Sequence, residues 1–455
     1  MKVSEVLSQL QEQNITKIKV GGFDIDGVFR GKYLSLDKFE SAASSGFGFC
    51  DVIFGWDSAD RMYEDGKYTG GRQGYPDLLS KIDLSTMRIH PWEPNTATFL
   101  VDFYSGDGTP FSHCPRGLLR RVVERARRLG FEPKSSVEFE FFFYAETPQS
   151  LREKHFRNLT PMTPGMFGYS VLRSAQRAAL VHDIIDFMGR YNCPVEGLHT
   201  ETGPGVYEVA IKYDHALAAA DRAAIFKTAL KVIAARHGLV ATFMAKLSSD
   251  LPGCGGHIHQ SLWDKEGRKN LFSDPADPNG LSRTFKHYIA GNIAMMREFA
   301  ALAVPNVNSY KRLVPGTWAP TSVAWGMENR TTSLRVINGP SDTAVRMEFR
   351  LPGADVNPYL GIAASLAAGL HGIEEKLPLT QPPVSGNAYD IAGVELPLLP
   401  RSLGEAAALL EKSRVARHYF GDPFVDHYVY TRRWEIAEFQ RAVTDWELAR
   451  YMEII

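Results

Sequence analysis

Two glutamates set two residues apart in an apolar run are the feature that most constrains the fold of this chain. In SVEFEFFFY, residues 136–144, Glu138 and Glu140 alternate with Val137, Phe139 and Phe141. Residues i and i+2 of a β-strand face the same side, so the two carboxylates share one face and the apolar side chains share the other. Such a strand is too apolar for the surface, and carboxylates so placed repel each other unless a cation or a proton intervenes. The stretch predicts a strand that presents paired acids to a polar cavity.

The same spacing recurs on two further predicted strands, and a hairpin adds one acid on each side of its turn. These patterns align His257, His259 and Ser261 in GGHIHQS, Arg346, Glu348 and Arg350 in VRMEFRL, and Glu201 and Glu208 in TETGPGVYEV. Each pattern alone also describes the solvated face of an ordinary strand. Together they indicate a cavity of acids, histidines and arginines inside a curved sheet.

The ligand types in this cavity favour a hard divalent cation, Mg²⁺ or Mn²⁺, since five glutamates and a histidine offer mainly oxygen ligands. The four cysteines form no CxxC pair, which argues against zinc and favours a reducing cytoplasm. Arginines beside such metals point to phosphate. There is no Walker loop and no kinase-type glycine loop, so metals, arginines and an aromatic platform would have to hold a nucleotide. The residues alone therefore predict a two-metal, phosphate-handling cavity, which also describes a hydrolase of phosphate esters.

Composition excludes several classes of partner. With a formal net charge of -1 and 23% charged residues, the chain has no excess of positive charge for nucleic acid. The arginine-rich helix predicted from Pro115, ending at Gly130, is interpreted as solvated or subunit-facing. No apolar run is long enough to cross a membrane and no targeting segment is visible, so we expect a cytoplasmic protein.

The chain of 455 residues is long enough for two domains. Before residue 110, alternating residues around Asp26 and Gly27 predict a hairpin, and TATFLVDFYS predicts a strand, so we expect a small sheet domain. After residue 110, strands alternate with helices predicted at 175–191, at 217–237 and directly after Asn357. The fold class predicted is α+β.

Longer motifs resemble the glutamine synthetase family, of the type I kind, over nearly the whole chain. They are VEFEF, HTETGPGVYEV, FMAK followed by GCGGHIHQS, NSYKRLVPG, ENRTTSLRV and RMEFRLPGADVNPYL. The resemblance implies an N-terminal β-grasp domain at residues 1–109 and a catalytic domain at 110–455, built on a curved antiparallel half-barrel sheet with surrounding helices. It also implies a homododecamer of two stacked hexameric rings, with active sites between subunits.

The resemblance implies roles for individual residues, with ATP as co-substrate and two or three Mg²⁺ or Mn²⁺ ions in each site. Glu140, Glu201 and Glu208 would hold one metal, and Glu138, His257 and Glu348 another. His259, Ser261, Tyr213, Arg335 and Arg346 would bind ATP, and Arg330 would face the phosphoryl group in transit. Arg312, Arg350, Gly253 and Glu140 would bind glutamate.

Two departures from the family pattern concern the substrates. Where the family usually reads Asn-Gly-Ser-Gly-Met, residues 252–256 read PGCGG, which removes an asparagine contact to glutamate. Where the family's VPG loop continues with a glutamate that takes a proton from ammonium, this chain has Trp318. The loop that would supply an ammonium-binding aspartate reads FGFCDVIFGWDSAD, so Asp57 and Asp77 are the candidates for that role.

This pattern resembles enzymes that join glutamate to an organic primary amine through a γ-glutamyl phosphate, giving a γ-glutamyl amide, ADP and phosphate. Trp318, Asp57 and Asp77 would line the amine pocket. One alternative is a true glutamine synthetase that uses ammonia, with Trp318 packed against a neighbouring subunit. Another is a catalytically idle member used in assembly. Tyr389, in NAYD, stands where some relatives are adenylylated, but one tyrosine in a loop is too little to predict regulation.

Overall fold

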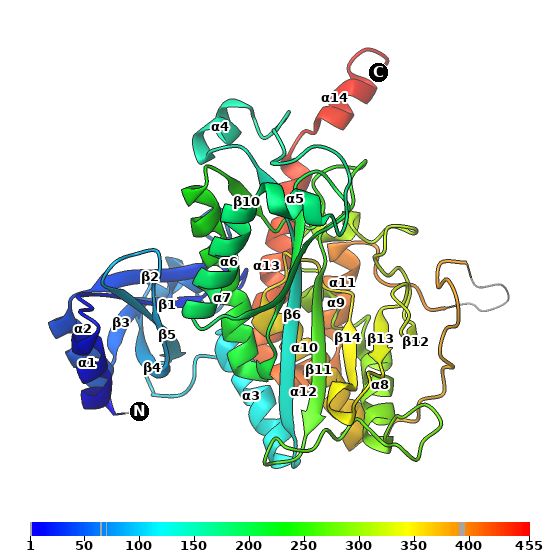
Figure 1. Ribbon diagram of the computed structural model, residues 1–455, viewed down its shortest axis with the longest axis horizontal. Coiled ribbons are helices and arrows are strands. Elements are labelled where there is room, and N and C mark those ends of the chain that lie inside the picture. Colours follow the sequence, from blue (N-terminus) through cyan, green and yellow to red (C-terminus); the bar gives the residue numbers. More distant parts are fainter. Residues whose placement is uncertain (1, 64–65, 70, 391–395) are drawn as a thin grey trace.

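The computed structural model describes residues 2–63, 66–69, 71–390 and 396–455, and its strands form a small and a large sheet with helices around them (Figure 1). The strands are β1 Lys17–Phe23, β2 Phe29–Leu34, β3 Phe47–Cys50, β4 Asp77–Ile89, β5 Thr96–Tyr104, β6 Glu132–Tyr144, β7 Val195–Thr200, β8 Val206–Ile211, β9 Asp214–His215, β10 Val240–Thr242, β11 Gly256–Trp263, β12 Trp325–Met327, β13 Leu334–Ile337 and β14 Arg346–Phe349. The α-helices are α1 Val3–Glu12, α2 Leu36–Ser45, α3 Pro115–Arg128, α4 Pro148–Glu153, α5 Val171–Gln176, α6 Ala178–Arg190, α7 Ala216–Arg236, α8 Arg283–Met295, α9 Ala300–Ala303, α10 Pro358–Glu374, α11 Leu403–Lys412, α12 Arg414–Phe420, α13 Asp422–Arg441 and α14 Asp445–Tyr451. Short 3-10 helices lie at Asp51–Phe54, Gly71–Gln73, Asn308–Lys311 and Asp342–Ala344.

The small sheet has the strand order β2-β1-β5-β4-β3. Its central strands β1 and β5 are parallel, and the other pairs are antiparallel. Phe39 of α2 packs on Phe99 of β5 with ring centroids 4.8 Å apart, so α2 covers one face of the sheet. A helix packed across a sheet with a central parallel pair is the arrangement expected of a β-grasp domain.

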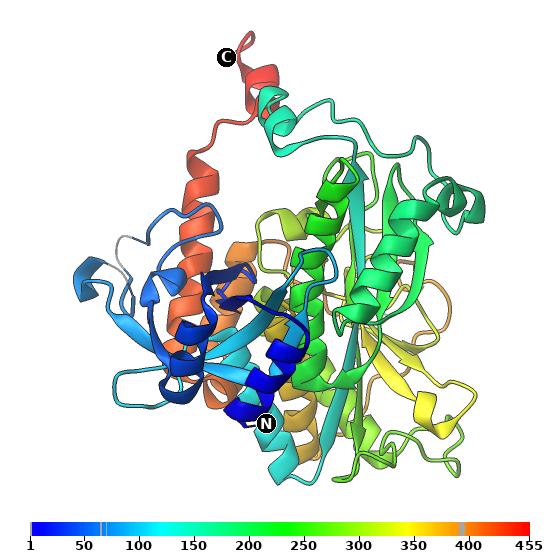
Figure 2. The same cartoon turned by 60° about the vertical axis from the view of Figure 1, so that its left-hand side comes forward.

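The large sheet has the order β12-β13-β14-β11-β6-β8-β7, and β9 and β10 also pair with β6. All its pairs are antiparallel except β12 with β13. Val137, Phe139 and Phe141 of β6 are buried on one face. Phe139 stacks on Phe226 of α7 there, with centroids 6.1 Å apart. Helices α3 and α7 pack on β6, and α10 packs on both helices, so the sheet carries its hydrophobic core on this face (Figures 1 and 2).

The α+β class and the half-barrel sheet are confirmed, and the parallel pair of β12 and β13 is the exception to the antiparallel expectation. The prediction of one continuous helix at 175–191 is wrong. Two helices, α5 and α6, cover this stretch, because Arg177 between them has a non-helical backbone. The start after Asn357 is confirmed, since its side chain accepts a hydrogen bond from the Tyr359 amide. The chain leaves the small sheet at Tyr104 and enters α3 at Pro115, and the domain boundary at 109 and 110 stays a prediction.

The arginine-rich helix α3 is solvated at Arg127 and Arg128, as expected, but its first arginine is buried; its contact with another subunit stays a prediction. Arg116 of α3 is 2% exposed, and its guanidinium joins the small sheet to helix α7. It donates to Asp83 of β4 at 2.8 Å, to Asp102 of β5 at 2.6 Å and to Asp221 of α7 at 2.8 Å. Burying a charge is favourable only when it is paired, and three carboxylates satisfy it here. Among the described helices, none is long and apolar enough to cross a bilayer.

Candidate active site

The alternating residues of the large sheet that do not enter the hydrophobic core line two adjoining cavities, which share Glu138 and Ala210. The larger cavity has a volume of about 940 Å³ and the smaller about 330 Å³. The larger is lined by Glu138, Glu140, Glu201, Glu208, His257, Glu348, Gly253, Arg312, Arg330, Arg335, Arg350 and Trp318 among the residues singled out from the sequence. The smaller is lined by Glu138, Tyr213, His259, Ser261 and Arg346. The fold thus gathers on one surface side chains that are up to 212 positions apart in the sequence, from Glu138 to Arg350.

The first cluster of possible metal ligands is created by strand register. Glu138 of β6 lies opposite His257 of β11, and His259 of β11 lies opposite Glu348 of β14. Nδ1 of His257 is 3.4 Å from a Glu348 oxygen and 3.8 Å from a Glu138 oxygen. The set of Glu138, His259 and Glu348 has ligand atoms within 4.8 Å of one another. These carboxylates and imidazoles are suited to one divalent cation.

The second cluster lies on the hairpin of β7 and β8. His199 is 3.7 Å from oxygens of both Glu201 and Glu208, and these three offer ligand atoms within 4.8 Å of one another. Glu140 lies opposite Glu208 across the β6–β8 pair and accepts a hydrogen bond from the Gly255 amide at 2.8 Å. Burial, together with the charge of Glu208, raises the pKa of Glu140 despite the opposing influence of His257. A cation at this cluster would offset both the burial of Glu140 and its repulsion by Glu208.

Gly255 allows the two clusters to approach each other. A Cβ atom on this residue would lie 2.6 Å from Nε2 of His257 and 2.9 Å from Oε1 of Glu140. Real Cβ atoms essentially never approach another heavy atom so closely, so any larger residue would displace a candidate ligand. Residue 255 must therefore be glycine if His257 and Glu140 are to keep these positions.

Arginines surround Glu348 and fix its charge. Arg350 donates to one oxygen of Glu348, and Arg335 donates to the other at 2.9 Å. Burial pushes the pKa of Glu348 up, but Arg350 and the two histidines of the first cluster more than offset this and hold it at about 2. The carboxylate is therefore ionised and available as a ligand at neutral pH.

Two arginine nitrogens in the larger cavity are buried and lack a hydrogen-bond partner. They are Nε of Arg335 and Nε of Arg350. Buried donors are normally satisfied, so these atoms indicate that the site is built for an anionic or polar ligand. Arg312 is held differently, because it donates to the backbone carbonyls of Leu351 at 2.9 Å and Arg350 at 3.2 Å.

The smaller cavity has basic and aromatic walls. Nε of Arg346 donates to Nδ1 of His259 at 3.2 Å, and Nε2 of the same ring lies 3.1 Å from an oxygen of Glu138. Lys134 lies 3.6 Å from the ring centroid of Trp263 and 5.9 Å from that of Tyr213. These features suit a phosphate group next to a flat aromatic or heterocyclic ring.

Trp318 lies on the rim of the larger cavity. It is 65% exposed and has φ of +60°, a left-handed conformation that is uncommon for a residue with a large side chain. Its backbone carbonyl accepts a hydrogen bond from Arg350 at 3.4 Å. The tryptophan is therefore held beside the arginines by its backbone, and its ring is free to contact a ligand.

The structure does not bring Asp57 or Asp77 to these cavities. Asp57 accepts from the amides of Ala59 and Arg61, at 2.8 and 2.9 Å, and from the Trp434 indole at 3.3 Å, so it caps its own loop against α13. Asp77 begins β4 opposite Cys50. Neither is among the described residues that line the two cavities of the same chain. Any role in this chemistry would require a second subunit.

Some residues of the site were missed from the sequence. His199 stands two positions before Glu201, so the same alternation that identified the other ligands could have found it. Trp263 likewise continues the series of His257, His259 and Ser261. Tyr169, which stacks on His199 with centroids 4.3 Å apart, and Asp250, which lines the larger cavity outside both clusters, lie on irregular segments that carry no comparable signal.

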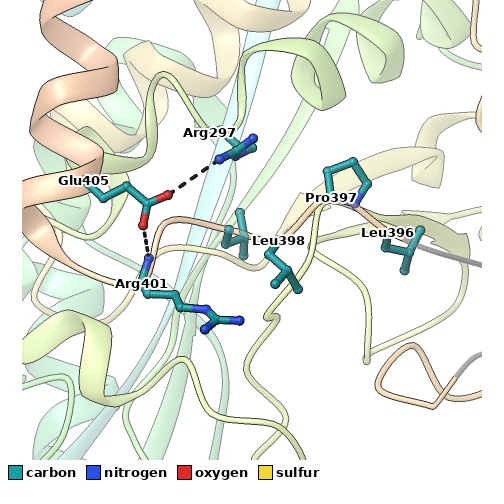
Figure 3. Close-up of a pocket in the computed structure, with 7 residues that line it drawn as sticks. Arg297, Leu396, Pro397, Leu398, Arg401 and Glu405 are labelled. Atoms are coloured by element: carbon teal, nitrogen blue, oxygen red, sulfur yellow. Dashed lines mark hydrogen bonds and ion pairs between the residues drawn. The ribbon is translucent and has the colours of Figure 1, made fainter.

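Another pocket, of about 500 Å³, is lined by residues outside these strands (Figure 3). Its one acid, Glu405, is 3.6 Å from Arg297 and accepts a hydrogen bond from the Arg401 backbone amide at 3.0 Å. The remaining walls are Leu396, Pro397, Leu398 and Leu399. Among its described lining residues, no histidine or second acid is available for metal or acid-base chemistry.

Comparison with known proteins gives consistent matches. The family described as glutamine synthetase, catalytic domain, matches residues 112–451. The chain is 49% identical over 451 residues to type-1 glutamine synthetase 2 of Dictyostelium discoideum, covering 99% of this chain and 86% of that protein. It is 40% identical over 455 residues to a glutamate–isopropylamine ligase of a Pseudomonas species, covering 100% and 98%. A solved structure described as a GmaS/ADP complex matches with a TM-score of 0.85 and 30% identity, over 98% of this chain and 99% of that one.

Proposed function

The chain belongs to the glutamine synthetase family, and we propose that it is an ATP-dependent ligase that joins the γ-carboxylate of glutamate to an organic primary amine. The observation that carries the proposal is Trp318, which lines the same cavity as Arg312, Arg330, Arg335, Arg350 and the six proposed metal ligands. The 40% identity to a glutamate–isopropylamine ligase supports the same reaction class.

The proposed first half of the reaction uses the two clusters and the arginines. Glu140, Glu201 and Glu208 would hold one Mg²⁺ or Mn²⁺, and Glu138, His257 and Glu348 another; Tyr213, His259, Ser261, Arg335 and Arg346 would bind ATP. Such cations, when bound, neutralise the charge of the phosphates. Arg312, Arg350, Gly253 and Glu140 would hold glutamate while its γ-carboxylate attacks the γ-phosphate of ATP. Arg330 would stabilise the charge on the group in transit, ADP would leave, and γ-glutamyl phosphate would remain.

The proposed second half is attack of a neutral amine on the acyl carbon, which forms the C–N bond and releases phosphate. Trp318 would contact the amine substituent by burial of apolar surface or, for a second cationic group, by cation-π attraction. The attacking nitrogen must lose a proton. Asp57 or Asp77 of a neighbouring subunit, Asp250 of the same chain, or water would accept it. Of these carboxylates, Asp250 is the one that lines the cavity within a single chain.

We also propose a cytoplasmic homododecamer with two domains, 1–109 and 110–455, and with active sites between subunits. The oligomeric part of this proposal is supported by the C-terminal arm, which extends away from the body in α14 (Figure 1). Trp446, Met452, Ile454 and Ile455 in this arm are 63 to 92% exposed. Apolar side chains so exposed and close together favour burial against another copy of the chain.

The test is ADP release with ATP and Mg²⁺, measured with glutamate alone, with glutamate and ammonium, and with glutamate and each of a panel of primary amines. The proposal expects release that requires glutamate and is fastest with an amine, together with a γ-glutamyl amide in the product mixture. Release that is fastest with ammonium would identify a glutamine synthetase. ADP release without glutamate would favour a hydrolase. No ADP release under any condition would favour an inactive assembly protein.

A further inference from the structure

We propose that Tyr389 is a positioning residue that holds the loop carrying Trp318 over the cavity, an inference that rests on the proposed amine-ligase function. The phenol oxygen of Tyr389 donates a hydrogen bond to the Ala319 carbonyl at 2.9 Å. The preceding carbonyl, that of Trp318, accepts from Arg350 at 3.4 Å. Two consecutive peptide carbonyls at the cavity rim are therefore held by side chains from outside the loop.

Other restraints lie on either side of the tryptophan, since the Thr317 hydroxyl donates to the Val314 carbonyl at 2.6 Å and Ala319 is buried. Gly316 has φ of +80°, and a Cβ atom placed on it would meet nothing within 4 Å. The Trp318 side chain is mostly exposed and its left-handed backbone is unfavourable for a residue with a Cβ atom. Since packing contributes little to holding the ring, its position depends on the loop backbone, and the hydrogen bonds to the two carbonyls tie that backbone to side chains outside the loop.

The segment that carries Tyr389 is in turn attached to the two residues that flank Arg330. The side-chain nitrogen Nδ2 of Asn329 donates to the carbonyls of Val384 at 3.1 Å and Gly386 at 2.8 Å. The hydroxyl of Thr331 accepts from the Ala388 amide at 2.9 Å. The phosphoryl-facing arginine and the amine-facing tryptophan are thus connected through a single short segment.

The chemistry of Tyr389 suits a fixed donor. Its ring is half-buried, and burial raises the pKa of its hydroxyl even though Arg350 and Arg312 act in the opposite direction. The hydroxyl therefore keeps its proton at neutral pH and donates it to the Ala319 carbonyl. A tyrosine in this position controls where the Trp318 ring lies without itself touching the reacting atoms.

Tyr389→Phe tests this role, because it removes the hydroxyl and keeps the ring. We expect the KM for the preferred amine to rise about 3- to 10-fold, the effect of losing one hydrogen bond, while the KM values for ATP and glutamate change less than twofold. Thr331→Val, which removes the acceptor for the Ala388 amide, should shift the amine KM in the same direction. Tyr428→Phe is the matched control, since Tyr428 donates to the Ala301 carbonyl at 2.7 Å in the helical core, away from the cavities.

A double variant separates positioning of Trp318 from a general structural effect. If Tyr389 acts through the tryptophan, Tyr389→Phe should have no further effect on amine KM in a Trp318→Ala background. An unchanged amine KM in Tyr389→Phe, or an undiminished effect in the double variant, would overturn the inference while the amine-ligase function stands. Failure of the unmodified protein to use any amine would instead overturn the proposed function and the inference with it.

Discussion

Replacing Trp318 by alanine tests the amine half of the proposed reaction. The ring is 65% exposed on the cavity rim, so roughly two thirds of its surface is free to contact a ligand. A tryptophan side chain contributes about 150–250 Å² when fully buried. If a small alkyl substituent covers about a third of that area, about 50–80 Å² of apolar surface leaves water. At about 25 cal/mol per Å², the contact stabilises the bound amine by about 1–2 kcal/mol.

This free energy corresponds to a change in kcat/KM of about tenfold. We expect kcat/KM for the preferred alkyl amine of the panel to fall by about that factor in Trp318→Ala, and kcat/KM for ammonium, which has no substituent, to change little. The ratio of the two is the measured quantity, obtained from ADP release at saturating ATP and glutamate. KM values for ATP and glutamate should be unchanged, because the metal and arginine side chains are not altered.

Val314→Ala is the matched control for this experiment. Val314 is an exposed residue of the same loop, and the described lining of the cavity does not include it. It should leave the amine-to-ammonium ratio as it is. The reasoning is refuted if Trp318→Ala leaves that ratio unchanged, or if ammonium equals or exceeds every amine in the unmodified protein. Trp318 would then be a packing residue, and the protein an ordinary glutamine synthetase.

Other perturbations test the remaining parts of the site and one buried group. Glu140→Gln should reduce kcat at least a hundredfold while keeping the fold, because an amide is a poorer ligand of the same shape; normal turnover at ordinary Mg²⁺ concentrations would contradict the assignment. Arg312→Lys should raise the KM for glutamate about tenfold or more with little change for ATP, since lysine keeps the charge but loses the two-pronged hydrogen bonding; an unchanged glutamate KM would place the substrate elsewhere. Burial lowers the pKa of His427 from 6.5 to about 4, and its Nε2 donates to the Phe54 carbonyl at 2.9 Å. As the pH falls, the unfolded chain binds this proton before the folded chain does. The free energy of unfolding is therefore unaffected by His427 above pH 6.5 and decreases by at most about 3 kcal/mol as the pH falls to about 4. The fall in Tm from pH 7 to pH 5 should therefore be smaller in His427→Gln than in the unmodified protein, and an equal fall in both would exclude this histidine as a cause.

Much of the site could be predicted from local alternation in the sequence. Glu138 and Glu140 must share a face of any strand that contains them, and the same holds for His257 with His259 and for Arg346 with Glu348. The side-chain period of a strand is a property of the backbone, so it does not depend on what surrounds the strand. For the same reason, the cap at Asn357 could be recognised without knowledge of the rest of the chain.

Only the tertiary structure decided how these faces meet. The pairing of β6 with β11 sets Glu138 opposite His257, and the pairing with β8 sets Glu140 opposite Glu208. A shift of one residue in either register would turn the acids away from the cavity, and no local pattern specifies which register forms. The burial of Arg116 and the bond from Tyr389 to the Ala319 carbonyl join segments 105 and 70 positions apart. Such contacts depend on the packing of whole elements, whereas the residue types that supply the chemistry are already present in the sequence.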